Sequence, residues 1–319
     1  MPKRSKTDAH SLRHVQQRAA HDADQTEFAA VINGSTVVDA GIFDDRIADS
    51  MDDYRADDPM NVVSQSHRHD IAYDSAAGAV HEEILRRIDL LGDAYPFSLS
   101  GNNISHTQSK NLVYEFFLAI CNSPNITANP YTGLPRIFER LSAQIVRGYM
   151  GVHTSAIHTG APRDNGTSFR EVMEQLNRES GEWIWGPEPE LPDEPADQDG
   201  GVDFVTWKMA HDGRCKGQLF LLCQCACGND WDTKLNDLNL RRLAKWFHPP
   251  WLVTPVRAFA TPMHLVDGHL NEASRIAGVV FDRARLTMIA NQAECADAVA
   301  LFRAEITDLI ALVIGDEAA

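Results

Sequence analysis

The stretch that most limits how this chain can fold is DGGVDFVTWKMAHDGRCKGQLFLLCQCACG, residues 199–228. It contains two apolar runs, 202–209 and 218–227, and such runs are typical of buried β-strands. The residues between them, AHDGRCKG, are polar and include types that favour turns. The stretch therefore predicts two neighbouring strands joined by a turn.

Each of these strands carries a polar side chain among apolar ones. Because side chains alternate along a strand, Asp203 and Gln224 can lie side by side on one face of the pair. A carboxylate is costly to bury without a cation or hydrogen-bond donors. We therefore expect a polar site at this point. The alternatives are a strand-start aspartate bonded to backbone N–H groups and a core amide bonded to neighbouring backbone.

The rest of the chain alternates between helical and strand patterns. Apolar residues recur at helical spacing in 80–91, 109–123, 134–151, 168–180, 230–247 and 295–315. A further strand is expected over 254–265, and 277–290 is either a strand or the start of a helix. This order predicts an α/β fold in which helices flank a mixed β-sheet.

Composition divides the chain into three parts. Residues 1–75 are polar with weak periodicity, and we expect them to be largely flexible. Residues 76–130 are expected to form a helical N-terminal subdomain, and 131–319 a larger domain that holds both strands. Within that domain 182–201 is rich in Pro, Gly and acidic residues, which predicts an irregular acidic loop.

The overall composition restricts the class of protein. A chain of 319 residues with 44% hydrophobic residues is long enough to bury a large core. It has no apolar run of about 20 residues and no apolar signal segment, so we expect a cytoplasmic protein without membrane contact. Its formal net charge of −16 is unusual for a protein that binds nucleic acid through the backbone. If it acts on nucleic acid, a local basic patch or a partner must hold the substrate.

Three of the six cysteines alternate along the second strand. Cys223, Cys225 and Cys227 have the spacing of small buried apolar residues, and we expect them in the core. Structural zinc sites more often use pairs of cysteines from turns, so a zinc site is the less favoured alternative.

Three pieces of the sequence occur in an informative order. They are IFERLSAQIVRGYMG with Glu139, QDGGVDFVTW with Asp203, and LFLLCQCACG with Gln224. Together they resemble the Mrr-like branch of the PD-(D/E)XK nuclease superfamily, over about residues 134–265. The resemblance implies a restriction-endonuclease-like mixed sheet flanked by helices, with a long insertion over 152–198. It also implies Mg²⁺ or Mn²⁺ held by Asp203, Gln224 and Glu139.

The chain departs from that pattern at one position. The superfamily places a lysine two residues after the strand Glu or Gln, and this chain has Ala226 there. A cation near the attacking water is needed to offset the charge that develops on phosphorus. Lys234 is the preferred substitute, and Lys208 and Lys216 are the other lysines nearby.

The resemblance implies a metal-dependent nuclease that hydrolyses phosphodiester bonds, with DNA favoured over RNA. The acidic charge suggests the effector of an anti-phage defence or DNA-processing system that acts with a partner ATPase or helicase subunit, and a homodimer fits cleavage of two strands. The alternative is a catalytically inactive nuclease-fold module that binds nucleic acid or a protein partner. Ala226 and the neutral Gln224 favour that alternative.

Overall fold

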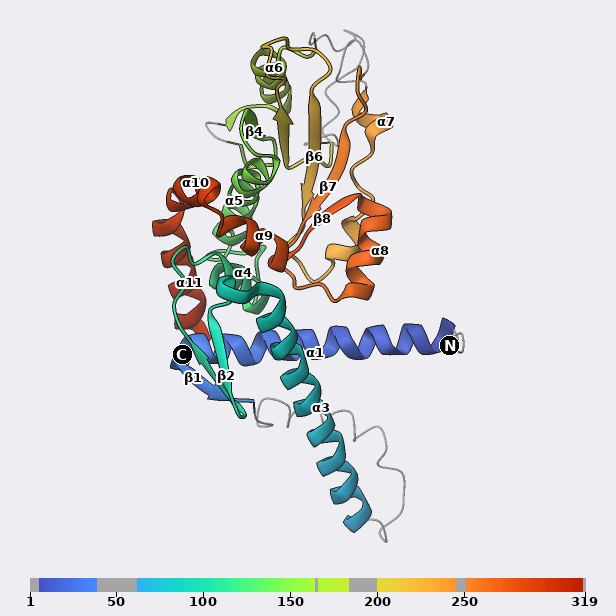
Figure 1. The fold of residues 1–319 in the computed structure, drawn as a ribbon, viewed down its shortest axis with the longest axis vertical. Coiled ribbons are helices and arrows are strands. Elements are labelled where there is room, and N and C mark those ends of the chain that lie inside the picture. Colours follow the sequence, from blue (N-terminus) through green and yellow to red (C-terminus); the bar gives the residue numbers. More distant parts are fainter. Residues whose placement is uncertain (1–5, 39–61, 164–165, 184–199, 245–250, 318–319) are drawn as a thin grey trace. The chain divides into compact units, whose positions relative to one another are not determined.

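The computed structural model describes residues 6–38, 62–163, 166–183, 200–244 and 251–317 (Figure 1). The chain divides into two compact units, Met1–Ser109 and Lys110–Ala319. Neither predicted boundary, 75/76 or 130/131, coincides with this division. The units are described separately.

The first unit combines long helices with a small sheet. Helix α1 spans Lys6–Asn33 and helix α3 spans Val62–Leu91, followed by the short 3₁₀ helix η3 at Gly92–Ala94. Strands β1 (Ser35–Val37), β2 (Phe97–Ser100) and β3 (Asn103–His106) form an antiparallel sheet in the order β1-β3-β2.

The expectation of a largely flexible segment over 1–75 is wrong for the part that the structure describes. Helix α1 buries Ala19, Ala23, Phe28 and Ala30, and it packs against α3. The apolar pattern of this helix is weak in the sequence because charged residues, including Asp24 and Glu27, are buried among the apolar ones. Residues 39–61 lie outside the described part.

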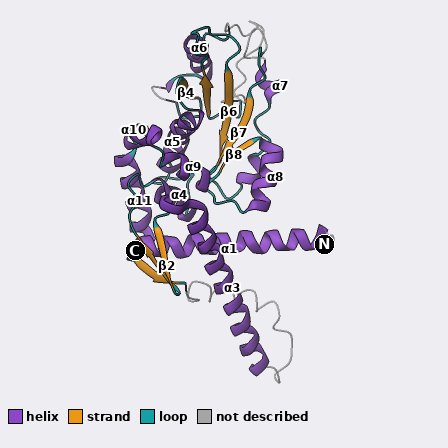
Figure 2. Ribbon diagram, viewed as in Figure 1, coloured by secondary structure: helices purple, strands orange, loops and turns teal. Residues whose placement is uncertain are grey.

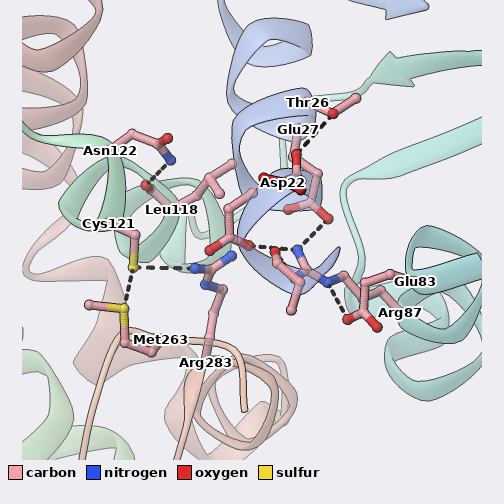
Figure 3. Close-up of polar contacts among 12 residues, drawn as sticks. Asp22, Thr26, Glu27, Glu83, Arg87, Leu118, Cys121, Asn122, Met263 and Arg283 are labelled. Atoms are coloured by element: carbon pink, nitrogen blue, oxygen red, sulfur yellow. Dashed lines mark hydrogen bonds and ion pairs between the residues drawn. The ribbon is translucent and has the colours of Figure 1, made fainter. Parts of the chain in front are cut away.

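A buried arginine explains how α1 tolerates these charges. The guanidinium of Arg87, on α3, is fully buried and donates to Asp24 at 2.7 Å, Glu27 at 2.8 Å and Glu83 at 3.1 Å. It also donates to the carbonyl of Ala20, and Figure 3 shows Arg87 beside Glu27 and Glu83. Carboxylates at this depth need such a counter-charge, so this cluster joins α1 to α3.

The second unit is built on a five-stranded mixed sheet (Figure 2). Its strands lie in the order β4-β5-β6-β7-β8, where the first two pairings are antiparallel and the last two parallel. The strands are β4 (Thr154–His158), β5 (Phe204–Lys208), β6 (Leu219–Cys225), β7 (Val256–Ala260) and β8 (Val279–Phe281). The α/β class, the strand pair β5–β6 and strand β7 are as the sequence predicts.

Helices cover both faces of this sheet. Helix α5 (Gly133–Met150) packs on β4 and β5, where the Thr206 hydroxyl bonds to the sulfur of Met150 at 3.0 Å. Helix α6 (Phe169–Ser180) packs on the opposite face against Trp207 and Phe220. Helix α8 (Asp267–Ala277) contributes to a second core cluster with Phe259 and Val280. Successive side chains of β5 and β6 therefore point to opposite faces of the sheet and are buried on both, as expected for strands covered by helices on each side.

Helix α4 (Val113–Asn122) belongs to the second unit and not, as predicted, to an N-terminal subdomain. It packs against α5, α9 (Arg283–Ala290) and α11 (Arg303–Glu317). The buried Arg283 connects the end of α4 to the loop after β7. Its guanidinium donates to Cys121 at 3.3 Å (Figure 3) and to the carbonyl of Pro262 at 2.9 Å.

A local cap explains why α6 begins where it does. The Ser168 hydroxyl accepts from the N–H of Glu171, whose carboxylate accepts from the N–H of Ser168 at 2.6 Å. These hydrogen bonds hold the pKa of Glu171 below its usual value. The pair satisfies two N–H groups that the helix start leaves without partners.

Two predicted helices differ from the structure. In place of the helix predicted over 230–247, the described residues 230–244 form a 3₁₀ helix, η5 (Trp231–Lys234), and the short α7 (Leu240–Leu243). The closing helix predicted over 295–315 is broken into η7 (Ala293–Cys295), α10 (Ala296–Ala300) and α11, so Leu301 is 80% exposed rather than on the buried face. Most of the predicted acidic loop, residues 184–199, lies outside the described part.

Across the described ranges, no helix combines the length and apolar character that a membrane crossing requires.

The Arg87 cluster makes a testable contribution to stability. Replacing Arg87 with Met removes the buried guanidinium that bridges Asp24, Glu27 and Glu83, and we expect the free energy of unfolding of the chain to fall by about 3–5 kcal/mol. Urea denaturation followed by circular dichroism measures this loss. Arg86→Met is the matched control, because the Arg86 side chain is half exposed and should contribute less than about 1 kcal/mol. Equal effects of the two substitutions would contradict this role of the cluster.

Candidate functional site

Strand pairing brings Asp203 and Gln224 together at one end of the sheet. Phe204 is paired with Cys223, and just beyond this pair the N–H of Asp203 donates to the Cys223 carbonyl at 2.9 Å. Asp203 and Gln224 follow next in this register. The Asp203 carboxylate accepts from the N–H of Cys225 at 2.6 Å. The backbone of β6 therefore fixes the position of the Asp203 carboxylate.

Helix α5 brings a second carboxylate to the same place. A Cβ atom built on Gly160 would lie 2.8 Å from Oε2 of Glu139 and 3.1 Å from Oδ1 of Asp203. These two carboxylate oxygens therefore lie near one point, no farther apart than the sum of the two distances. Any side chain at 160 would crowd both carboxylates, and the N–H of Gly160 donates to the Asp203 carbonyl at 2.9 Å.

A histidine that the sequence did not single out completes this group. His158 is the last residue of β4, and its Nε2 lies 2.9 Å from Oε2 of Glu139. The same Nε2 would be 3.2 Å from a Cβ at Gly160. Residues 152–198 were expected to be an insertion, but they contain the sheet strand β4 and helix α6. The sequence TSAIH does not alternate between apolar and polar residues, so it gave no clear signal of this strand.

The side-chain amide of Gln224 is buried, but within the described ranges only its nitrogen is hydrogen-bonded. The side chain is 7% exposed, and its Nε2 donates to the carboxylate of Asp237 at 3.3 Å. Its carbonyl oxygen is buried and has no hydrogen-bond partner among the described residues. A buried carbonyl without a partner is costly, and a bound cation would satisfy it. Asp237 is a second site residue that the sequence did not single out.

The predicted residues line one cavity of about 410 Å³. Lys234 is half-buried at the end of η5, and it lines this cavity together with the acidic residues. The complete lining is Glu139, Ala161, Gly201, Asp203, Gln224, Cys225, Lys234 and Asp237. The cavity therefore combines three carboxylates with one amine.

Gly200 and Gly201, just before Asp203, have a backbone conformation and close contacts that favour glycine. Both have positive φ, 63° and 76°, which a glycine adopts without strain. A Cβ on Gly201 would lie 2.9 Å from the carbonyl oxygen of Asp237. The pair therefore allows the start of β5 to pack against the segment that carries Asp237.

Ala226 stands where the superfamily places its lysine. It is 2% exposed, its N–H donates to the Ala260 carbonyl at 3.0 Å, and it packs with Leu235 and Phe259. It also lines a second cavity of about 450 Å³, so a longer side chain at this position would have space beside the core. Lys234 instead approaches from the segment after the strand.

The three cysteines in and just after β6, at 223, 225 and 227, are not expected to act as nucleophiles. Burial, a hydrogen bond to Cys223, and the charges of Cys223, Asp203 and Glu139 raise the pKa of Cys225 well above its usual value. Burial also raises the pKa of Cys223 and, strongly, of Cys227. Because the thiolate is the reactive form, Cys225 forms an unreactive wall of the cavity.

The ligand set fits a hard divalent cation in its chemistry. Carboxylate and amide oxygens are the groups that Mg²⁺ prefers, and Glu139, Asp203 and Gln224 supply them. No group of three or more His, Cys, Asp or Glu side chains that could hold a metal occurs in the ranges that the structure describes. The third protein ligand would therefore be the carbonyl oxygen of Gln224.

No family model, no curated protein and no solved structure matches this chain.

The raised thiol pKa values predict which cysteines react. At pH 8 a disulfide reagent such as DTNB should modify the exposed Cys215 first, because Cys223, Cys225 and Cys227 stay protonated and buried. Cys215→Ser should remove this fast phase, and the three strand thiols should react only after unfolding. Fast modification of Cys225 in the folded protein, detected by peptide mass spectrometry, would contradict the assignment of an unreactive wall.

Proposed function

We propose that this chain is a metal-dependent nuclease that hydrolyses phosphodiester bonds, with a restriction-endonuclease-like domain. One observation carries the proposal. Glu139, Asp203, Gln224 and Lys234 come from four separate elements, and all four line one cavity. The resemblance to the PD-(D/E)XK superfamily selects Glu139, Asp203 and Gln224, Lys234 is the preferred substitute for the lysine missing at Ala226, and no two of the four are neighbours in sequence.

The residues have distinct roles in this mechanism. Asp203, Glu139 and the Gln224 carbonyl would hold Mg²⁺ or Mn²⁺, which polarises a phosphate oxygen and makes a bound water more acidic. Lys234 would place a positive charge near the phosphoryl oxygens, where negative charge develops as the oxygen of the attacking water bonds to phosphorus and the P–O bond to the leaving oxygen breaks. The attacking water loses a proton to solvent in this step, and the leaving oxygen takes one up. Asp237 orients the Gln224 amide, so that its carbonyl faces the metal side. His158 orients Glu139.

The acidic net charge of the chain supports the proposal that a partner protein, and not this chain, binds most of the nucleic acid. With a net charge of −16 the chain itself attracts a polyanion poorly. We propose that a partner such as an ATPase or helicase subunit holds the nucleic acid, with DNA favoured over RNA, in a defence or DNA-processing system. A homodimer would present two such sites to two strands.

The second candidate is an inactive module of the same fold that binds nucleic acid or a protein. The buried Ala226 at the position of the family's lysine favours it. In this case the cavity residues would still bind metal or nucleic acid, but without hydrolysis.

Cleavage of DNA and RNA substrates, single-stranded and double-stranded, with Mg²⁺ or Mn²⁺ tests the proposal. Asp203→Asn keeps an acceptor for the Cys225 N–H but removes the charge, and we expect cleavage to fall about a hundredfold. Lys234→Met should cause a loss of similar size with metal affinity retained. Asp267→Asn on the surface of α8 and Lys110→Met are the matched controls and should retain full activity.

Cleavage that is unaffected by Asp203→Asn would show that the activity arises elsewhere. If Asp203→Asn removes activity and Lys234→Met does not, the carboxylate site stands and Lys234 is not the cation. Metal binding that requires Asp203, without cleavage of any substrate, would favour the inactive module.

A further inference from the structure

A second cavity, of about 450 Å³, adjoins the site. It shares Glu139, Cys225 and Lys234 with the site cavity. Its other walls come from the end of α4 with the loop after it, and from the loop that follows β6. A ligand in this second cavity would therefore touch the same lysine as a phosphate at the site.

The lining of this cavity is mostly uncharged. The apolar lining residues include Ile120, Pro124, Ile126 and Pro135, and the uncharged polar ones are Ser123, Asn125, Thr127 and Asn229. Among the lining residues Lys234 is the one cation, whereas Glu139 and Asp230 are acidic. A phosphate would be repelled from such a cavity, but a flat group with apolar faces and hydrogen-bonding edges would fit it.

Two of the lining residues, Ser123 and Asn125, carry polar side-chain groups that bear on what the cavity could hold. The hydroxyl oxygen of Ser123 is buried and has no hydrogen-bond partner among the residues described. The Asn125 side-chain oxygen accepts from the N–H of Thr127 at 2.9 Å and from its hydroxyl at 2.8 Å. These bonds fix the Asn125 amide, whose NH₂ group is then a positioned donor. A buried hydroxyl without a partner indicates a place where a ligand's polar atom belongs.

We infer that this cavity, the base pocket, holds the nucleobase of the nucleotide next to the scissile phosphate. The inference rests on the proposed nuclease function. A base has the required shape and chemistry, and the cavity volume lies within the range of small-ligand sites. A base that is stacked and paired in a duplex cannot enter such a pocket. The substrate at the site is therefore a single strand or an unpaired nucleotide.

An oligonucleotide experiment tests the base pocket. The cleaved bond is first mapped in a single-stranded oligonucleotide, and abasic positions are then introduced on each side of that bond. We expect one of these two abasic substrates to be cut about tenfold more slowly, because its sugar lacks the group that the pocket holds. The same abasic substrate should bind more weakly to the Asp203→Asn protein in fluorescence anisotropy without cleavage.

Substitutions in the pocket provide the matched comparison. Ile126→Trp fills the cavity, so the unmodified oligonucleotide should be cut about tenfold more slowly, whereas the abasic one should be cut as by the unaltered protein. Asn125→Ala, which leaves more space, should also weaken the preference for a base. Ile276→Trp, at an exposed position of α8 outside the cavity, is the control.

The outcomes separate the two proposals. Asp203-dependent cleavage at equal rates with and without either base would overturn the base pocket and leave the nuclease function standing. Failure to cleave any substrate in an Asp203-dependent way would overturn both.

Discussion

The site depends on two carboxylates, those of Glu139 and Asp203, whose oxygens would lie 2.8 Å and 3.1 Å from a Cβ atom at Gly160. Asp203 is fixed by the N–H of Cys225 on the neighbouring strand, and Glu139 by helix α5 on the face of the sheet that carries Thr206. Two carboxylates this close in a partly buried site repel each other. A protein that holds them in place needs hydrogen-bond donors or positive charge beside them, and the N–H of Cys225, Lys234 and a bound cation are the means that this geometry offers.

Much of this arrangement could be predicted from the sequence. The paired strands follow from two apolar runs around a turn, and helix α5 from its apolar stripe and the glycine at its end. The position of Asp203 beside Gln224 follows from the alternation of side chains. All four predicted site residues line one cavity, although Lys234 reaches it from a 3₁₀ helix and not from the α-helix that was expected.

What could not be predicted depends on contacts between distant residues. Strand β4 is an edge strand with one fully buried side chain, Ile157, so its apolar pattern is weak, and His158 was missed with it. Asp237 has a role only because the segment after β6 folds back over Gly201. Helix α1 has little apolar asymmetry, and the burial of Asp24 and Glu27 depends on Arg87, 63 and 60 residues away. Sequence patterns within one segment do not report such pairings.

The most direct measurement of the central claim is the anomalous diffraction of Mn²⁺ in crystals of the protein. We predict one Mn²⁺ peak between the carboxylates of Glu139 and Asp203, with the carbonyl oxygen of Gln224 as a further ligand at about 2.2 Å. Asp203→Asn should remove this peak. A site that binds Mn²⁺ elsewhere in the chain, or an empty space beside Gly160 at saturating Mn²⁺, would contradict the claim that these carboxylates form a metal centre.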